Sequence, residues 1–141
     1  MLKTISEALE NFCIHQIRLP YTISAEISDK ESLITYIDID TMAGDKYRVY
    51  IASEENFMQR ISKIFLEEDK SDLETLIDMS LETTNLVVGS AKVIAEEADE
   101  NPYVINTPHF IKVGIFDLDY DQAKLLKIQD DEIIIAIKGL N

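Results

Sequence analysis

Two carboxylates and one amide stand at helical spacing in the middle of the chain. Glu82 follows Asp78 by four residues, and Asn85 follows Glu82 by three. Because residues three, four and seven apart lie on one side of an α-helix, these side chains should form one continuous outward surface. They can hydrogen-bond, and the carboxylates can pair with cations. Simple solvation of an acidic protein also produces an outward Asp and Glu, so residue types alone leave the function undecided.

Three neighbouring residues are unusual for a solvated helix. Gly89 lies on the same face, although glycine inside a helix costs about 1 kcal/mol relative to alanine. Close packing with another helix would explain it, but its outward position favours access for another molecule. Leu86 and Val93 lie next to this surface and also point outward, where branched aliphatic side chains suggest contact with a partner.

A long helix is expected to carry these residues. The apolar pattern begins at a capping box formed by Ser71 and Glu74, runs without glycine or proline to Gly89, and resumes to about Ala98. At about 100° per residue, one sector of the helix must face the rest of the molecule. That sector contains Leu73, Leu76, Ile77, Ser80, Thr84, Val87, Val88, Ala91, Ile94 and Ala95.

Two shorter helices and about six strands should make up the rest. Apolar spacing predicts one helix over about 4–16 and another capped by Ser53, with a stripe of Phe57, Ile61, Ile64 and Phe65. Two-residue alternation predicts strands near 21–27, 33–39, 47–51, 110–116, 124–128 and 132–137, with a short extended piece at 103–105. The first three are expected to pair through turns near 28–30 and 43–45, and the last two as a hairpin.

These elements favour an α+β fold, in which an antiparallel sheet of about six strands packs against two long helices and an N-terminal helix. With 141 residues, of which 46% are hydrophobic, we expect a single domain over residues 1–141. The unbroken apolar strand at 132–137 should be either central in the sheet or an edge that another chain covers.

Composition excludes several classes of function. Thirteen basic against 27 acidic side chains give a formal charge of −14, which repels phosphate backbones and anionic lipid, so we expect no nucleic-acid or membrane partner. Solubility alone explains the acidity, although a basic protein partner would also fit. The N-terminal residues do not form an export signal, and no stretch reaches the roughly 18 apolar residues of a membrane span. Cys13 is expected to be a buried thiol, and a cytoplasmic location follows.

Metal binding by this chain is not expected. Asp117, Asp119 and Asp121 imitate the start of a calcium loop, but Gln122 replaces the required glycine and Ile128 stands where a bidentate Glu should be. The two histidines, His15 and His109, accompany no pattern of zinc ligands.

The spacing of the outward residues, however, resembles a known signature. Asp78, Glu82, Asn85 and Gly89 lie in DMSLETTNLVVGSAK, and Pro108 follows in INTPHF, twenty-three residues beyond Asn85. This series resembles that of the CheC, CheX and FliY chemotaxis phosphatases, where an Asp or Ser, a Glu, an Asn and a distant Pro recur at these intervals. The first helix lacks a Glu-x-x-Asn pair, so the resemblance is to the single-site CheX members. It implies a CheC-like fold.

The resemblance also implies a reaction, the removal of the phosphoryl group from the aspartate of a phosphorylated CheY-type response regulator. Asn85 would position the attacking water, because an amide hydrogen-bonds water but cannot accept its proton at neutral pH. Glu82 would dock the regulator by pairing with a lysine beside the phosphoaspartate. The sequence departs from the family at Thr83 and Thr84, where small or apolar residues are commoner.

The remaining site residues and partners follow from the same resemblance. Asp78, Gly89 and Pro108 would shape the site, while Leu86 and Val93 would supply apolar contact with the regulator. The chain would need no cofactor of its own, since Mg²⁺ would come with the regulator. CheX relatives form homodimers through their sheets, so a homodimer is expected here.

Two other classes of function fit the same residues. The chain could be a non-catalytic adaptor that binds a receiver or a flagellar switch component through the same helix face. It could also be a structural dimerising domain whose acidic face is merely solvated.

Overall fold

The computed structural model describes residues 1–98 and 102–140. Its helical elements are α1 (Leu2–Phe12), a π-helical turn η1 (Cys13–Ile17), α2 (Glu55–Leu66) and α3 (Leu73–Glu97). Its strands are β1 (Thr22–Ser24), β2 (Glu31–Thr41), β3 (Lys46–Ser53), β4 (Tyr103–Ile105), β5 (His109–Ile115), β6 (Gln122–Ile128) and β7 (Asp131–Gly139).

The strands form one antiparallel sheet, ordered β1-β6-β7-β3-β2-β4, with β5 also paired to β2. The described sheet therefore has seven strands rather than about six, because the extended piece at 103–105 pairs with β2 as strand β4. The expected pairing of the first two strands is wrong: β1 pairs with β6, and Ile23 lies opposite Leu126. The predicted hairpin of β6 and β7 is confirmed.

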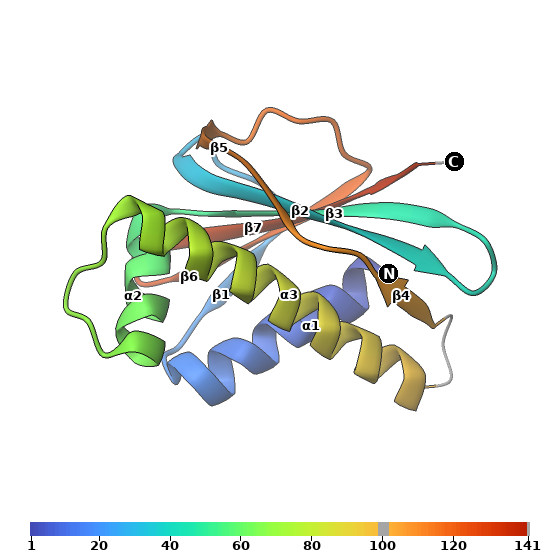
Figure 1. Ribbon diagram of the computed structural model, residues 1–141, viewed down its shortest axis with the longest axis horizontal. Coiled ribbons are helices and arrows are strands. Elements are labelled where there is room, and N and C mark those ends of the chain that lie inside the picture. The colour runs from blue at the N-terminus through green and yellow to red at the C-terminus, as the bar shows by residue number, and fades with distance from the viewer. Residues whose placement is uncertain (99–101, 141) are drawn as a thin grey trace.

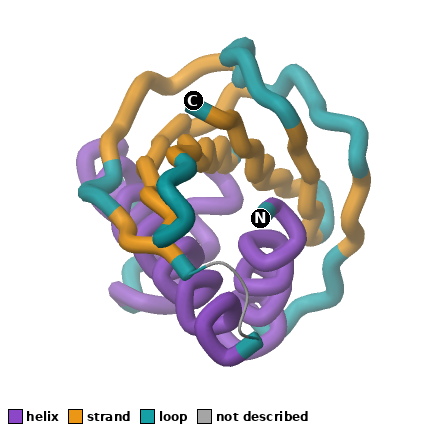
Figure 2. The backbone as a smooth tube through the Cα atoms, turned by 90° about the vertical axis from the view of Figure 1, so that its right-hand side faces the viewer, coloured by secondary structure: helices purple, strands orange, loops and turns teal. Residues whose placement is uncertain are grey.

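The three α-helices cover one face of the sheet, as Figures 1 and 2 show from two directions. The main hydrophobic core lies between these layers, where Ile37 and Ile39 of β2 and Ile135 of β7 meet Leu76 and Val88 of α3. This two-layer arrangement confirms the predicted α+β class with an N-terminal helix.

A smaller core on the other face explains the uniformly apolar last strand. Alternate residues of β7, Ile134 and Ala136, pack there with Tyr50 and Phe116. Strand β7 lies between β6 and β3, so the central position, one of the two alternatives, is correct. Both faces of β7 are covered within this chain, and its apolar run needs no second molecule.

Two predicted helix caps are wrong by one residue. Ser53 ends β3, and its buried hydroxyl has no hydrogen-bond partner among the described residues; α2 begins after Glu54. Asp72, and not Ser71, caps α3 by accepting a hydrogen bond from the Thr75 amide at 2.8 Å. That hydrogen bond lowers the pKa of the Asp72 carboxyl.

The first helix changes its winding near the end of the predicted range of 4–16. α1 ends at Phe12, and the chain continues as η1 until Arg18 takes a left-handed conformation with φ 62°. Cys13 begins this turn and is buried, as expected, and burial raises the pKa of its thiol to about 12.

Candidate functional site

Helix α3 is fixed to the sheet by buried hydroxyl groups directly beside the candidate site. The Thr84 hydroxyl donates to the Ser80 carbonyl at 2.8 Å and lies 2.6 Å from the Thr35 hydroxyl of β2. Thr83 is also buried, and its hydroxyl faces the Met58 sulfur at 3.9 Å. These contacts set the rotation of the helix, so that the next residue, Asn85, points outward.

The predicted inward sector of α3 is mostly right. Leu76, Val87 and Val88 are buried, but Leu73 is 50% exposed because it lies at the first turn, beyond the cover of neighbouring elements. Met79 and Thr83 are buried although the periodicity did not include them. α1 and α2 pack against α3 in addition to the sheet, which widens its buried sector.

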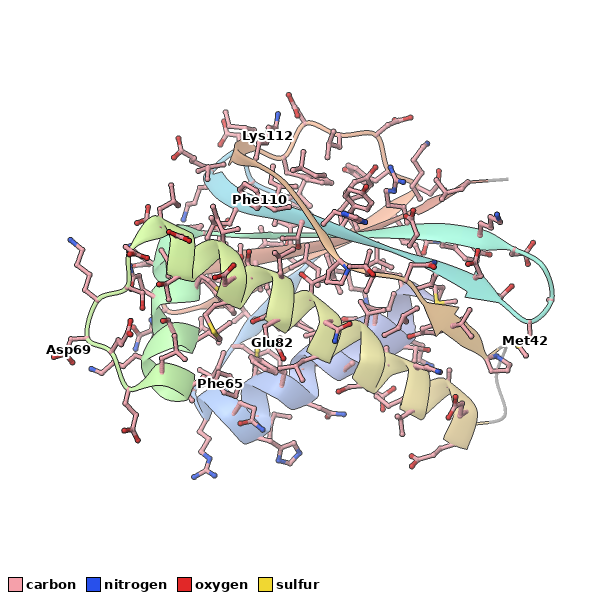
Figure 3. The ribbon with its side chains drawn as sticks, viewed as in Figure 1. Met42, Phe65, Asp69, Glu82, Phe110 and Lys112 are labelled. Carbon is pink, nitrogen blue, oxygen red and sulfur yellow. The ribbon has the colours of Figure 1, made fainter. Side chains whose placement is uncertain are left out.

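An open groove of about 710 Å³ runs between α3 and the connection from β4 to β5. Its lining residues are Asp78, Leu81, Glu82, Asn85, Ile105, Asn106, Thr107 and Pro108. The fold thus brings four sequence-predicted site residues, three from the helix and Pro108, to the same hollow. We call it the acidic groove. Figure 3 labels Glu82 on α3, and Figure 1 shows the β4–β5 connection passing that helix.

The wall opposite the helix is anchored at its first residue. The backbone amide of Asn106 donates to the Asp38 carbonyl at 2.9 Å, and the side-chain amide donates to the same carbonyl at 3.0 Å. The side-chain amide also lies 3.2 Å from a carboxylate oxygen of Asp40. Sequence reasoning missed Asn106, whose only signal was a polar residue two positions before Pro108.

The other end of this wall is held by an aromatic stack. The His109 ring, next to Pro108, stacks on Tyr36 with centroids 5.1 Å apart, and the Arg48 guanidinium lies 4.1 Å from the Tyr36 centroid. Thr107 and Pro108 are therefore fixed between two anchors on β2. Thr107 is the second lining residue that the sequence did not indicate, since its position depends on how β4 and β5 share one partner strand.

The electrostatic character of the groove is acidic. Among the residues that the structure describes, Asp78 and Glu82 are the only ionisable ones that line it, and no described lysine, arginine or histidine does. All three helix residues of the predicted series, including Asn85, are exposed. A phosphoryl group would be repelled here unless cations came with it.

Three predicted residues lie outside this groove. A Cβ added at Gly89 would meet the Ile105 side chain at 4.0 Å, an ordinary contact, so packing does not require glycine there. Leu86 is 40% exposed but lines a different hollow, on the α1 side of α3. Val93, at 51%, is exposed further along the helix.

Across residues 1–98 and 102–140, no three His, Cys, Asp or Glu side chains are grouped in a way that could hold a metal ion. The three carboxylates that imitate a calcium loop bind separate groups: Asp117 pairs with Lys112, Asp119 with Lys138, and Asp121 accepts from a backbone amide. No described helix is both long and apolar enough to cross a membrane.

Comparison with known proteins gives matches in structure alone. No family model and no curated sequence matches the chain. The crystal structure of chemotaxis protein CheX from Vibrio vulnificus is similar with a TM-score of 0.79 and 19% identity, over 96% of each chain. A CheC-like superfamily protein from Shewanella sp. PV-4 has a TM-score of 0.72 and 18% identity, over 98% of this chain and 97% of that one.

A third similar structure contains a partner. It is a chain of the CheX–CheY–BeF3–Mg²⁺ complex from Borrelia burgdorferi, with a TM-score of 0.69 and 14% identity, over 97% of each chain. The fold of this chain is therefore that of the CheC-like chemotaxis proteins. Within that class, the likeness to CheX that the motif predicted is confirmed at the level of the fold.

Proposed function

We propose that this chain, residues 1–141, is a CheX-like phosphatase domain that hydrolyses the phosphoaspartate of a CheY-type response regulator. The observation that carries the proposal is the acidic groove, where Asp78, Glu82 and Asn85 of α3 meet Pro108 from the β4–β5 connection. Residues matched to the family by spacing alone thus line one accessible surface. The CheC-like fold supports the same assignment.

Asn85 carries the chemical step in this proposal. Its amide hydrogen-bonds a water and holds it in line with the scissile P–O bond of the acyl phosphate. The water oxygen attacks phosphorus, the bond to the aspartate oxygen breaks, and the products are the free carboxylate and inorganic phosphate. Asn85 does not remove the water's proton, because an amide is no base at neutral pH. The proton passes to a phosphoryl oxygen or to solvent.

Glu82 docks the regulator. It lies one helical turn before Asn85, and its exposed carboxylate is available to a lysine beside the phosphoaspartate. Because no described lysine, arginine or histidine lines the groove, this lysine and Mg²⁺ come with the regulator and neutralise the phosphoryl group. The complex of a similar protein with CheY and Mg²⁺ supports such a partner. Asp78 on α3 and Pro108 on the β4–β5 connection shape the groove that receives the regulator.

The predicted cytoplasmic location and homodimer remain parts of this proposal. The covered position of β7 removes one reason to expect a dimer, but β5 pairs only with β2 within the described sheet. Val113 and Ile115 on β5 are exposed apolar residues, so this edge is the better candidate for joining two sheets. Analytical ultracentrifugation across a range of concentrations measures whether the chain dimerises.

The direct test mixes the purified chain with a phosphorylated CheY-type receiver from the same cell and follows phosphate release. We expect faster release than from the receiver alone, in proportion to the amount of chain added. Binding without acceleration would contradict the phosphatase and identify an adaptor. If the chain neither binds the receiver nor accelerates phosphate release, both the phosphatase and the adaptor function are contradicted.

A further inference from the structure

The apolar stripe of α2 continues beyond the elements that bury it. Phe57 and Ile61 are fully buried, whereas Ile64 and Phe65, on the same stripe, are 38% and 40% exposed. The helix ends there because Glu67 takes a left-handed conformation with φ 57°. The stripe predicted from the sequence is thus correct in position, but its last turn faces open space.

This uncovered turn forms one side of a second hollow. The Phe65 ring stacks on Phe12 of α1 with centroids 6.0 Å apart, and Leu86 of α3 closes the opposite side. The hollow has a volume of about 280 Å³, and the polar groups at its rim include Asn11, His15 and Ser90. We call it the apolar groove. Its size and lining suit an inserted apolar side chain of a protein partner.

The two grooves share helix α3. Asn85 lines the acidic groove, whereas the next residue, Leu86, lines the apolar groove. A protein that reaches Asn85 therefore also lies close to Leu86. Figure 3 shows Glu82 and Phe65 on the same side of the sheet.

The area of a specific interface supports one footprint over both grooves. Such an interface buries about 800 Å² and involves about 20–30 residues on each partner, whereas eight of the described residues line the acidic groove. The footprint must spread beyond it. The β4–β5 connection adds Asn106, Thr107 and Pro108 to the acidic groove, whereas the α1 and α2 flank adds a separate hollow lined by Phe12, Phe65 and Leu86, and large apolar side chains of this kind anchor interfaces.

We propose that the apolar groove is the second half of the receiver-docking surface and takes an apolar side chain of the same receiver whose phosphoaspartate faces Asn85. This inference rests on the proposed function. It assigns affinity to Phe65 and Leu86, and chemistry to Asn85. A receiver that lacks an apolar side chain at this position binds more weakly, because it leaves the apolar groove unfilled.

The test compares Phe65→Ser and Leu86→Ser with Met42→Ser. Met42 is 74% exposed in the turn between β2 and β3, at the opposite end of the molecule from Phe65 in Figure 3. We expect each groove variant to raise KM for the phosphorylated receiver, and Kd for the receiver loaded with BeF3 and Mg²⁺, by about tenfold. The kcat should stay within about twofold of wild type, since the acidic groove is untouched. Met42→Ser should match wild type.

Thermal unfolding identifies any groove variant that fails to fold. The milder variant Leu86→Ala is then tested in place of that variant. Groove variants with unchanged KM and Kd, beside an inactive Asn85→Ala, would overturn the docking proposal and leave the proposed function standing. A fully active Asn85→Ala would instead overturn the proposed function. Groove variants that change the sedimentation coefficient but not the receiver Kd would show that the groove binds a second copy, and would also overturn the proposal.

Discussion

At the scale of single residues, Glu82 and Asn85 divide docking from chemistry. Their side chains are one helical turn apart on the same groove. The obvious candidate for a general base would be the carboxylate of Glu82. It is exposed, however, and no described cationic residue lines its groove, so it suits an ion pair with the partner. The amide is the group that can orient a water without ionising.

Replacing Glu82 by glutamine separates these roles. Glu82→Gln keeps the shape and removes the charge, so we expect KM for the phosphorylated receiver to rise about tenfold because a charge-assisted hydrogen bond is weakened. The kcat should change far less. Steady-state assays at several salt concentrations measure this: KM of the wild type should rise with ionic strength more steeply than KM of Glu82→Gln. Equal salt dependence would contradict the docking role.

Helical periodicity was sufficient to place Asp78, Glu82 and Asn85 together, since their spacing depends only on local geometry. It could not place Asn106 or Thr107, because the opposite wall exists only when β4 and β5 pair with the same strand. The cap of α3 was misjudged by one residue because Ser71 and Asp72 are both suitable cap types. Ser71 is instead buried and bonded to Ser62 and Glu68.

At the scale of elements, the hydroxyl pair of Thr35 and Thr84 joins α3 to β2. Thr84→Val should lower the free energy of unfolding by about 1–2 kcal/mol, because it removes a buried hydrogen bond and leaves Thr35 only a longer contact with a carbonyl, at 3.3 Å. Changing both residues to Val should cost less than the sum of the single changes. Urea unfolding of the four proteins measures this coupling, and additive losses would contradict a shared hydrogen bond.

The wall of the acidic groove depends on Asn106. Asn106→Ala removes both side-chain hydrogen bonds to β2 but leaves its backbone bond to Asp38, so we expect the chain to fold and to lose about 1 kcal/mol of stability. A less rigid wall should lower kcat by about tenfold, because the water and the receiver are positioned less exactly.

Asp40→Asn is the matched control, since an amide oxygen can still accept from Asn106. Its kcat should stay near that of the wild type. Stopped-flow measurement of phosphate release from the receiver compares the two variants. If Asn106→Ala keeps the wild-type kcat, the anchored wall has no part in catalysis.

At the scale of the whole molecule, the predicted layers were correct, but the pairing of distant strands could not be predicted from the sequence. Apolar alternation identifies strands, but it does not decide that β1 pairs with β6 or that residues 103–105 join the sheet. Those choices depend on contacts between distant segments. The second core on the outer face was missed for the same reason, although the run from Ile133 to Ile137 was its signal.

The charge of the molecule predicts its choice of substrate. The net charge is −14, and the groove is lined by Asp78 and Glu82 with no cationic side chain among its described residues, so the chain should not accelerate hydrolysis of acetyl phosphate, even with millimolar Mg²⁺. A small acyl phosphate brings no lysine and no docking surface. Colorimetric phosphate detection checks this. Saturable hydrolysis of acetyl phosphate that disappears in Asn85→Ala would contradict the account.

The most direct measurement is single-turnover dephosphorylation of a phosphorylated receiver by Asn85→Ala, with binding to the receiver loaded with BeF3 and Mg²⁺ measured in parallel. Asn85 is exposed on α3, so the variant should fold as the wild type does. We predict a loss of acceleration of at least about 100-fold with Kd changed by less than about threefold. Acceleration equal to that of the wild type would contradict the proposed role of Asn85.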